Sequence, residues 1–278
     1  MAVYTNIDNP GLFFNTVLYT GNGSTQSITG VGFQPDWVWL KARNHAYSHQ
    51  LFDVVRGATK LLSCEETSAE QTLSGVTSFD SDGFAVGSDA GSNASSKTFA
   101  SWNWLTGSSA SSNSDGSTSS TVSVNQTAGF SICQWTSADT GAVKTVGHGL
   151  GVKPDWIVWK STSRTVDWIT FHVSTGKDKN AGWLDGTSGS SDQNYWGNTE
   201  PTSTVFSTEG ATEDSGTSLA SGGYMIVPRG TTAQRNALRD GTNNSATLMT
   251  GSMFYDTDLN KLCVYDNGGW KGVTLGSL

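Results

Sequence analysis

Carboxylates, histidines and aromatic residues are the side chains of this sequence that could do chemistry, and the carboxylates set the first limit. Glu65, Glu66 and Glu70 lie close together on a Ser/Thr-rich stretch. Such a stretch is typical of a solvated loop, whereas glycoside hydrolysis needs two carboxyl groups held across a cleft. Asp80 and Asp82 flank an Asp-Gly turn signal, and no Glu follows at the spacing of an EF-hand. The sequence therefore predicts neither a hydrolase nor a calcium site.

The histidines add no catalytic or metal-binding motif. His45 and His49 share one loop without an obvious third ligand, and His148 lies between glycines, where a tight turn explains it. GxSxG, P-loop and HExxH motifs are absent from the sequence. We therefore predict a protein that is not an enzyme, with no cofactor and no metal.

The three cysteines predict buried, reduced thiols. Cys64, Cys133 and Cys263 are far apart and form no CxxC pair, so the usual spacing of a zinc site is missing. Free cysteines are among the most buried residues of proteins. Reduced thiols fit assembly in a reducing cytoplasm.

Two groups of residues outside the expected strands are candidates for ligand contact. Sugars are held by aromatic faces and a few fixed polar groups, and loops on a rigid sandwich commonly carry function. Two interpretations stay open, contact with a receptor glycan or packing against the sandwich edge or a neighbouring chain, because Tyr and Trp enrichment fits both. The candidates are His45, Tyr47 and His49 in one stretch and Trp183, Asp185, Tyr195 and Trp196 in another.

Composition and charge limit the partners. Among 278 residues, glycine (33) and tryptophan (11) are abundant and proline (5) is scarce, which suits many short strands joined by polar turns. The net charge is −8, and no Lys/Arg patch of the kind that phosphates require is visible, so we expect no nucleic-acid partner. The chain shows no signal peptide and no apolar stretch of about 20 residues, so we expect no membrane insertion.

A repeated motif is the strongest structural signal. "GFQPDWVWLKAR" begins at Gly32 and "GLGVKPDWIVWKSTSR" at Gly149, and Asp36 and Asp155 lie 119 positions apart. Proline cannot donate to a β-ladder, so Pro35 fits the start of a strand, and the apolar run that follows predicts a strand covered on both faces. The repeat predicts a duplicated β-module.

The order of the surrounding elements supports this duplication. Strands are expected at residues 13–21, 51–57 and 97–105 in the first copy, and at 129–137 and 168–176 in the second. Residues 107–126 fit either a flexible linker or a polar edge strand. We predict an all-β fold of two tandem antiparallel jelly-roll or β-sandwich modules, residues 1–127 and 128–223, plus a small C-terminal hairpin segment, residues 224–278.

The quoted stretches resemble a known family. "GFQPDWVWLKAR", "LFDVVRGATKLLS" and "KTFASWNW" resemble a concanavalin-like module of structural proteins in marine bacteriophages. "GFSICQWTS" with "GVKPDWIVWKS" resembles its companion module, and "PRGTTAQRNAL…GSMFYDTDLNKLCVYDNGGWKGV" resembles C-terminal segments of phage tail proteins. Where the companion module usually ends in an aromatic strand, this chain has "SGTSLASGGYMIV". That module is therefore expected to be closed differently, for example by the C-terminal segment.

The resemblance implies a virion structural protein. Its expected place is a tail fibre or tail-attached appendage that contributes to host recognition; the alternative is a head decoration protein or head fibre on the capsid. The implied partners are other virion proteins of the tail or capsid, further copies of the chain in a homo-oligomer such as a trimer, and a host surface glycan. The implied location is the virion, assembled in the host cytoplasm.

Overall fold

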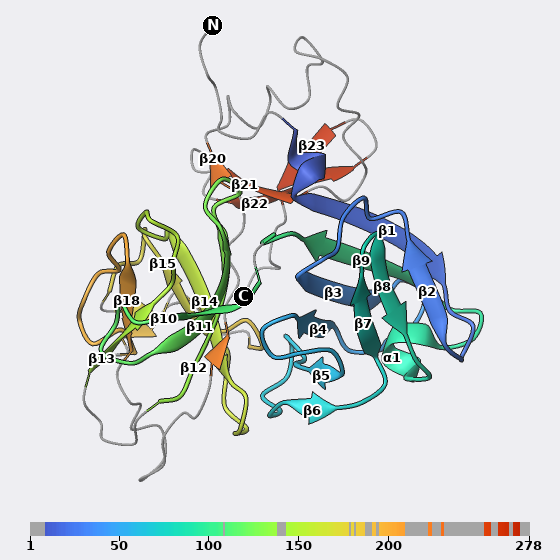
Figure 1. Cartoon of the computed structure of the whole chain (residues 1–278), viewed down its shortest axis with the longest axis horizontal. Helices are drawn as coiled ribbons and strands as arrows, with labels where there is room; N and C mark the ends of the chain where they lie inside the picture. The colour runs from blue at the N-terminus through green and yellow to red at the C-terminus, as the bar shows by residue number, and fades with distance from the viewer. Residues whose placement is uncertain are drawn as a thin grey trace, which may run out of the picture.

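The computed structural model describes residues 9–107, 109–137, 143–177, 179–180, 182–186, 191–192 and 195–208, and then the strands 222–223, 229–230, 253–256, 261–266 and 269–272. The chain is all-β with several antiparallel sheets, as predicted (Figure 1). The helices described are one turn each, the 3₁₀ turn η1 (Pro10–Leu12) and α1 (Ala90–Asn93). No helix in these residues is long and apolar enough to cross a membrane.

The first half of the chain forms a β-sandwich. One sheet has the order β1-β9-β3-β4 and the other has the order β2-β8-β7. Between them lies a core that includes Val38, Phe52 and Phe84. The strands are β1 (Phe14–Thr20), β2 (Gln26–Thr29), β3 (Trp37–Ala42), β4 (Gln50–Asp53), β7 (Val76–Asp80), β8 (Gly83–Val86) and β9 (Thr98–Trp104), with a separate pair β5 (Lys60–Leu61) and β6 (Gln71–Thr72).

The hairpin β7–β8 turns at the predicted Asp82-Gly83 step. The carboxylate of Asp82 accepts the backbone N–H groups of Gly30 and Gly32 at 3.0 and 2.7 Å, and these bonds lower its pKa. A Cβ at position 83 would lie 1.9 Å from the carbonyl oxygen of Ile28, so only glycine fits there. The Asp82 carboxylate therefore stabilises the β7–β8 turn through these two hydrogen bonds.

The second half forms a sheet with the order β10-β11-β12-β19-β14-β15. Its first two strands fall within residues 107–126, so this stretch forms strands and not only a linker; β10 is the edge strand, whereas β11 pairs on both sides. The strands are β10 (Ser111–Asn113), β11 (Ser120–Asn125), β12 (Phe130–Trp135), β14 (Trp156–Ser161), β15 (Ile169–His172) and β19 (Gly222–Gly223), with the separate pairs β13 (Lys144–Gly147) with β18 (Val205–Thr208) and β16 (Lys179–Asn180) with β17 (Ser191–Asp192).

The two halves repeat one topology. β12, β19, β14 and β15 follow each other as β1, β9, β3 and β4 do. The strand entry is the same in atomic detail: Val54 N–H donates to the Asp36 carbonyl at 2.9 Å, and Val173 N–H donates to the Asp155 carbonyl at 2.8 Å. The duplication inferred from the repeated motif is thus visible in both the strand order and the hydrogen bonds.

The strand β19 shows how the second copy is closed. It pairs with both β12 and β14, the place that β9 takes between β1 and β3. Its described residues come from the stretch that lacks the aromatic strand, so this stretch itself supplies a strand at that position. A strand from the C-terminal segment is therefore not needed at the position between β12 and β14. The domain limits at 127 and 223 stay a prediction, although β10 and β11 join the sheet of the second half.

The C-terminal strands form a sheet of their own. Its order is β20 (Arg229–Gly230), β21 (Met253–Asp256), β22 (Lys261–Asp266) and β23 (Gly269–Gly272). β21 and β22 are antiparallel partners, which confirms the predicted hairpin, whereas β20 runs parallel to β21.

One hydrophobic core joins the two halves. Its buried members include Trp104 of β9, Phe130 of β12 and Trp168, which precedes β15. The loop of residues 62–70 adds polar contacts, since Trp168 Nε1–H donates to the Ser63 carbonyl at 2.9 Å. The halves therefore pack into one body.

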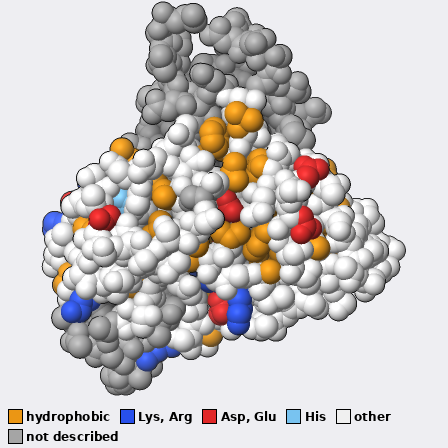
Figure 2. All heavy atoms as spheres, in the orientation of Figure 1, with side chains coloured by type: hydrophobic (Ala, Val, Ile, Leu, Met, Phe, Trp, Pro, Cys, Tyr) orange, Lys and Arg blue, Asp and Glu red, His pale blue; other side chains and the backbone are white. Residues whose placement is uncertain are grey.

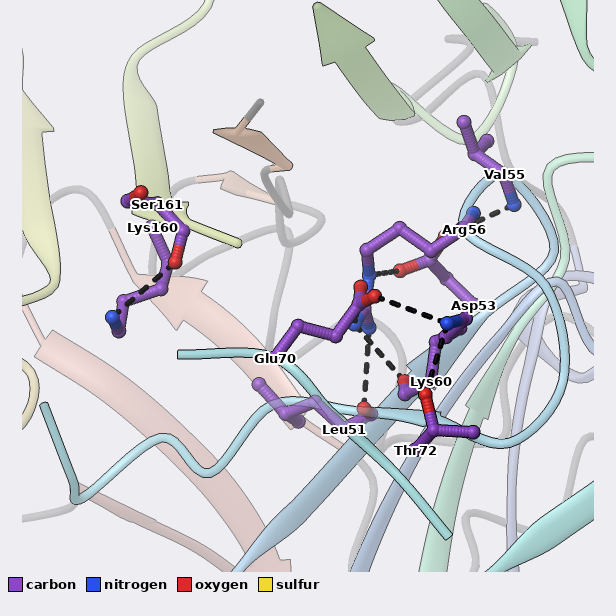
Figure 3. A network of polar contacts seen from close by, with 9 residues as sticks. All are labelled: Leu51, Asp53, Val55, Arg56, Lys60, Glu70, Thr72, Lys160 and Ser161. Atoms are coloured by element: carbon purple, nitrogen blue, oxygen red, sulfur yellow. Dashed lines mark hydrogen bonds and ion pairs between the residues drawn. The ribbon is translucent and has the colours of Figure 1, made fainter. Parts of the chain in front are cut away.

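Arg56 holds this joining loop in place. Its guanidinium is 2% exposed and binds the carboxylate of Asp53 at 2.5 Å and that of Glu70 at 3.2 Å. It also donates to the carbonyls of Leu51 and Lys60 (Figure 3). A buried guanidinium with this many partners fixes the end of β4 to the loop that contacts the second half.

Candidate functional site

The sheet β1-β9-β3-β4 has a second face, opposite the sandwich core. Side chains alternate along a strand. On β3, Val38 and Leu40 point into the sandwich, so Trp37, Trp39 and Lys41 point to the other face. The tryptophans of β9 continue this face, because Trp102 lies beside Trp39 and Trp104 beside Trp37.

The inner row of this face is covered by the second half. Phe130 of β12 lies 6.1 Å from the ring centre of Trp104 and 6.4 Å from that of Trp37. Phe14 of β1 packs on Trp104 at 4.8 Å. These contacts belong to the core that joins the halves, so this row offers no ligand surface.

The next row is half-buried, and its two tryptophans pack against the edge of the same core. Trp39 and Trp102 meet edge to face with ring centres 6.0 Å apart. The indole N–H of Trp39 donates to Nδ1 of His49 at 2.8 Å. We call Trp39, Trp102, His49, Tyr47 and His45 the aromatic platform. Hydrophobic side chains gather where the halves meet, and charged ones are scattered (Figure 2).

The loop after β3 supplies the exposed part of the platform. His45 is exposed and its ring stacks on that of Tyr47 with centres 4.0 Å apart. Lys41 donates to the Tyr47 carbonyl, which ties the loop back to β3. Sequence reasoning grouped His45, Tyr47 and His49, and the structure brings them to one side of the sheet.

Two carboxylates hold this loop through hydrogen bonds. Glu65 accepts the backbone N–H of His49 at 2.6 Å, and Glu66 accepts the hydroxyl of Ser48 at 2.6 Å. The acidic stretch therefore holds the loop through hydrogen bonds instead of only facing solvent. No group of three His, Cys, Asp or Glu in the described residues is arranged to hold a metal ion.

Burial sets the protonation of His49. Desolvation lowers its pKa, with a smaller opposing effect of Glu65 and a smaller supporting effect of Lys41. The neutral imidazole is therefore the main form near neutral pH. Because Nδ1 accepts the Trp39 bond, the proton lies on Nε2, which makes this atom a hydrogen-bond donor on the platform.

The second group of candidates lies deeper than expected. Trp196 is 0% exposed and Tyr195 is 4% exposed, and both belong to the core that joins the halves. Trp183 is half-buried, 5.9 Å from Tyr195 between ring centres. Asp185 accepts the backbone N–H of Trp168 at 3.1 Å, and burial raises its pKa. Tyr195 and Trp196 present no face to a ligand, so the candidate surface narrows to the platform.

Sequence reasoning placed Trp39 and Trp102 mostly on core strands or their edges, and both pack against the core that joins the halves. Cys64 and Cys133 are buried thiols that form no disulfide, as predicted, and the side chain of Cys263 lies outside the described residues.

The comparison with protein families places both halves in one domain, in agreement with the single body described above. Residues 9–225 match the model of a domain of unknown function, DUF7483. The chain belongs to the DUF7483 family. The match runs from just before β1 to just after β19, so the DUF7483 domain includes both halves and the platform. No curated protein and no solved structure matches the chain.

Proposed function

We propose that this DUF7483 protein is a structural component of a bacteriophage virion, not an enzyme. Its place is a tail fibre or tail-attached appendage that contributes to host recognition. The support is the resemblance of both PDW-containing modules, and of the C-terminal segment, to phage virion proteins. A second support is the all-β body, a rigid scaffold of the kind on which recognition loops are carried.

The aromatic platform is the proposed recognition surface, with a host surface glycan as the ligand. The observation that carries this proposal is the pair Trp39 and Trp102, half-buried side by side on the sheet, with His49 hydrogen-bonded to Trp39. His45 and Tyr47 stack on each other in the loop that leads to His49. The apolar face of a sugar ring packs on indole and phenol rings. The Nε2–H of His49 is a donor for a sugar hydroxyl.

The location in the virion is tested by immunogold labelling of intact particles with an antibody to this protein. Gold at the tail is the expected result. Gold spread over the head would replace the tail proposal with a head decoration protein or head fibre on the capsid. Particles without gold that nevertheless package DNA would contradict a virion role altogether.

The non-enzymatic part of the proposal has a separate test. Purified protein is incubated with capsule and lipopolysaccharide from the host, and reducing ends are measured over time. We expect no increase above a heat-treated sample. Sustained release of oligosaccharides would overturn it and make the protein a glycan-degrading spike.

A further inference from the structure

The edge strand β1 is built unlike the other sheet edges of the described chain. It is seven residues long, pairs with β9 in one unbroken register, and contains no charged residue and no proline. Exposed edges of this kind readily pair with another chain, and proteins commonly block them with charges, bulges or short strands. β1 has none of these devices.

The other edge strands of the first-half sandwich and of the large second-half sheet are protected against pairing with another chain. β7 carries a register shift between Val76 and Ser78 and ends in the charged Asp80. β4 is bridged by Leu62, and β15 is bridged by Trp183. β10 has three residues and β2 has four. Among the edge strands of these sheets in residues 9–208, β1 alone is seven residues long, regular and uncharged.

The backbone of β1 has one set of groups directed outward. Phe13 C=O accepts the N–H of Leu105, and Gly21 N–H donates to Lys97 C=O, both at 2.8 Å. Bonding alternates along an antiparallel pair, so the odd residues between them face β9. The even residues, Phe14 to Thr20, direct their N–H and C=O away from the sheet. One described contact uses them, the side-chain amide of Gln26 on the Thr20 carbonyl.

We propose that β1 pairs in antiparallel fashion with β1 of a second copy of this chain, centred on Val17. Thr16 then lies opposite the partner's Leu18 and Phe14 opposite the partner's Thr20. These pairs form about eight backbone hydrogen bonds across the edge. The 59% exposed side chain of Leu18 gains the partner copy's Thr16 as its cross-strand neighbour.

The occupant is a second copy for two reasons. The net charge of −8 makes two copies repel each other over most of their surfaces. β1 contains no charged residue, so two copies can meet at this strand without bringing like charges together. In addition, the other described edges of a second copy are short, bulged, charged or bridged, so its β1 is the edge that fits. A strand that pairs with itself closes a two-fold dimer and leaves no open edge.

This pairing makes one eight-stranded sheet from two four-stranded sheets. The two-fold axis is perpendicular to the sheet, so both aromatic platforms face the same side. Two platforms on one face raise the avidity for a repetitive glycan. This consequence rests on the proposed function, whereas the pairing itself does not. A two-fold contact also differs from the trimer that the resemblance to fibres implies.

Disulfide trapping tests the register. In a Cys263→Ser chain, Val17→Cys places two thiols directly opposite each other, about 4.5 Å apart between Cα atoms. Thr20→Cys is the control, since the two copies of that position would be about 20 Å apart. We expect a disulfide-linked dimer on non-reducing gels for Val17→Cys alone. Equal cross-linking of both variants, or of neither, would overturn the register.

Light scattering of the full chain tests the contact without a cysteine. We expect a dimer for the wild type and a monomer for Leu18→Lys. Leu12→Lys is the matched control, because Leu12 is 57% exposed but lies in η1, off the strand. A monomeric or trimeric wild type, or equal dissociation by both lysines, would overturn the proposal. The dimer proposal and the recognition proposal can fail independently. A platform variant that no longer binds glycan is expected to remain a dimer.

Discussion

The two copies of the module share one structural position that is open in the first and closed in the second. Lys41 on β3 and Lys160 on β14 lie 119 positions apart, at equal distance from the repeated Asp. Lys41 is half-exposed and donates to the Tyr47 carbonyl. Lys160 is 0% exposed and donates to the carbonyls of Thr67 at 2.9 Å and of Arg164 at 3.2 Å.

His49 and Trp168 make the same contrast at the end of the following loop. Both donate their backbone N–H to a carboxylate of the next loop, Glu65 for His49 and Asp185 for Trp168. Trp168 is 1% exposed, because the loop of residues 62–70 covers it, and His49 is half-exposed. Duplication therefore produced one copy of this position that is buried where the halves join and one that stays half-exposed.

The largest expected effect follows from truncating the closed position. Trp168→Ala removes a buried indole and leaves the Ser63 carbonyl without its donor, so the free energy of unfolding falls by about 3–5 kcal/mol. His49→Ala, at the open position, costs about 1 kcal/mol. Urea unfolding of both variants checks this. Similar losses would mean that the two positions are not open and closed as described.

Replacement of the two equivalent lysines by methionine gives the second-largest expected change in stability. Lys160→Met leaves carbonyls of Thr67, Ser161 and Arg164 without a donor, which costs about 2 kcal/mol after the gain from no longer burying a charge. Lys41→Met costs less than about 1 kcal/mol, because water replaces its bond. The same unfolding assay measures both. A more stable Lys160→Met protein would show that the buried ammonium does not hold the halves together.

The buried ammonium also gives stability a pH dependence at high pH. Burial lowers the pKa of Lys160 to about 8 from 10.5, so the unfolded chain binds this proton more tightly than the folded chain. The contribution of Lys160 to stability therefore rises between pH 8 and pH 10.5 and is flat below pH 8. The difference in unfolding free energy between wild type and Lys160→Met, followed across that range, measures it. A constant difference would contradict the lowered pKa.

The smallest expected effect is the loss of stability that protonation of His49 causes at acidic pH. The pKa of His49 is lowered by burial, so the unfolded chain takes up the proton first and stability falls as the pH drops through about 6.5. Below the pKa of the folded state the loss stops. His49→Gln removes this dependence, by less than about 1 kcal/mol, whereas His45→Gln at an exposed position leaves it intact. Thermal unfolding between about pH 7.5 and about pH 5 compares them, and an unchanged slope in His49→Gln would rule out this residue as the cause.

The sequence predicted the repeated framework better than it predicted burial. Pro35 and the apolar runs marked the strands, and Asp82-Gly83 marked the hairpin, because these signals are local. Tyr195 and Trp196 lie in a glycine- and serine-rich stretch that looks exposed, but they fill the core between the halves. Which face of a strand meets another module depends on contacts between residues distant in sequence. Trp196 was therefore predicted as a candidate for ligand contact, although it is 0% exposed.

Binding of the purified protein to host cells and to a glycan array tests the open position most directly. Trp102→Ala alters the platform, and Trp156→Ala removes another half-buried indole, in the second half, as a matched control. The account predicts at least a tenfold weaker Kd for Trp102→Ala, about 1.4 kcal/mol, and an unchanged Kd for Trp156→Ala. Equal binding by both variants, or equal loss, would contradict the platform as the recognition surface.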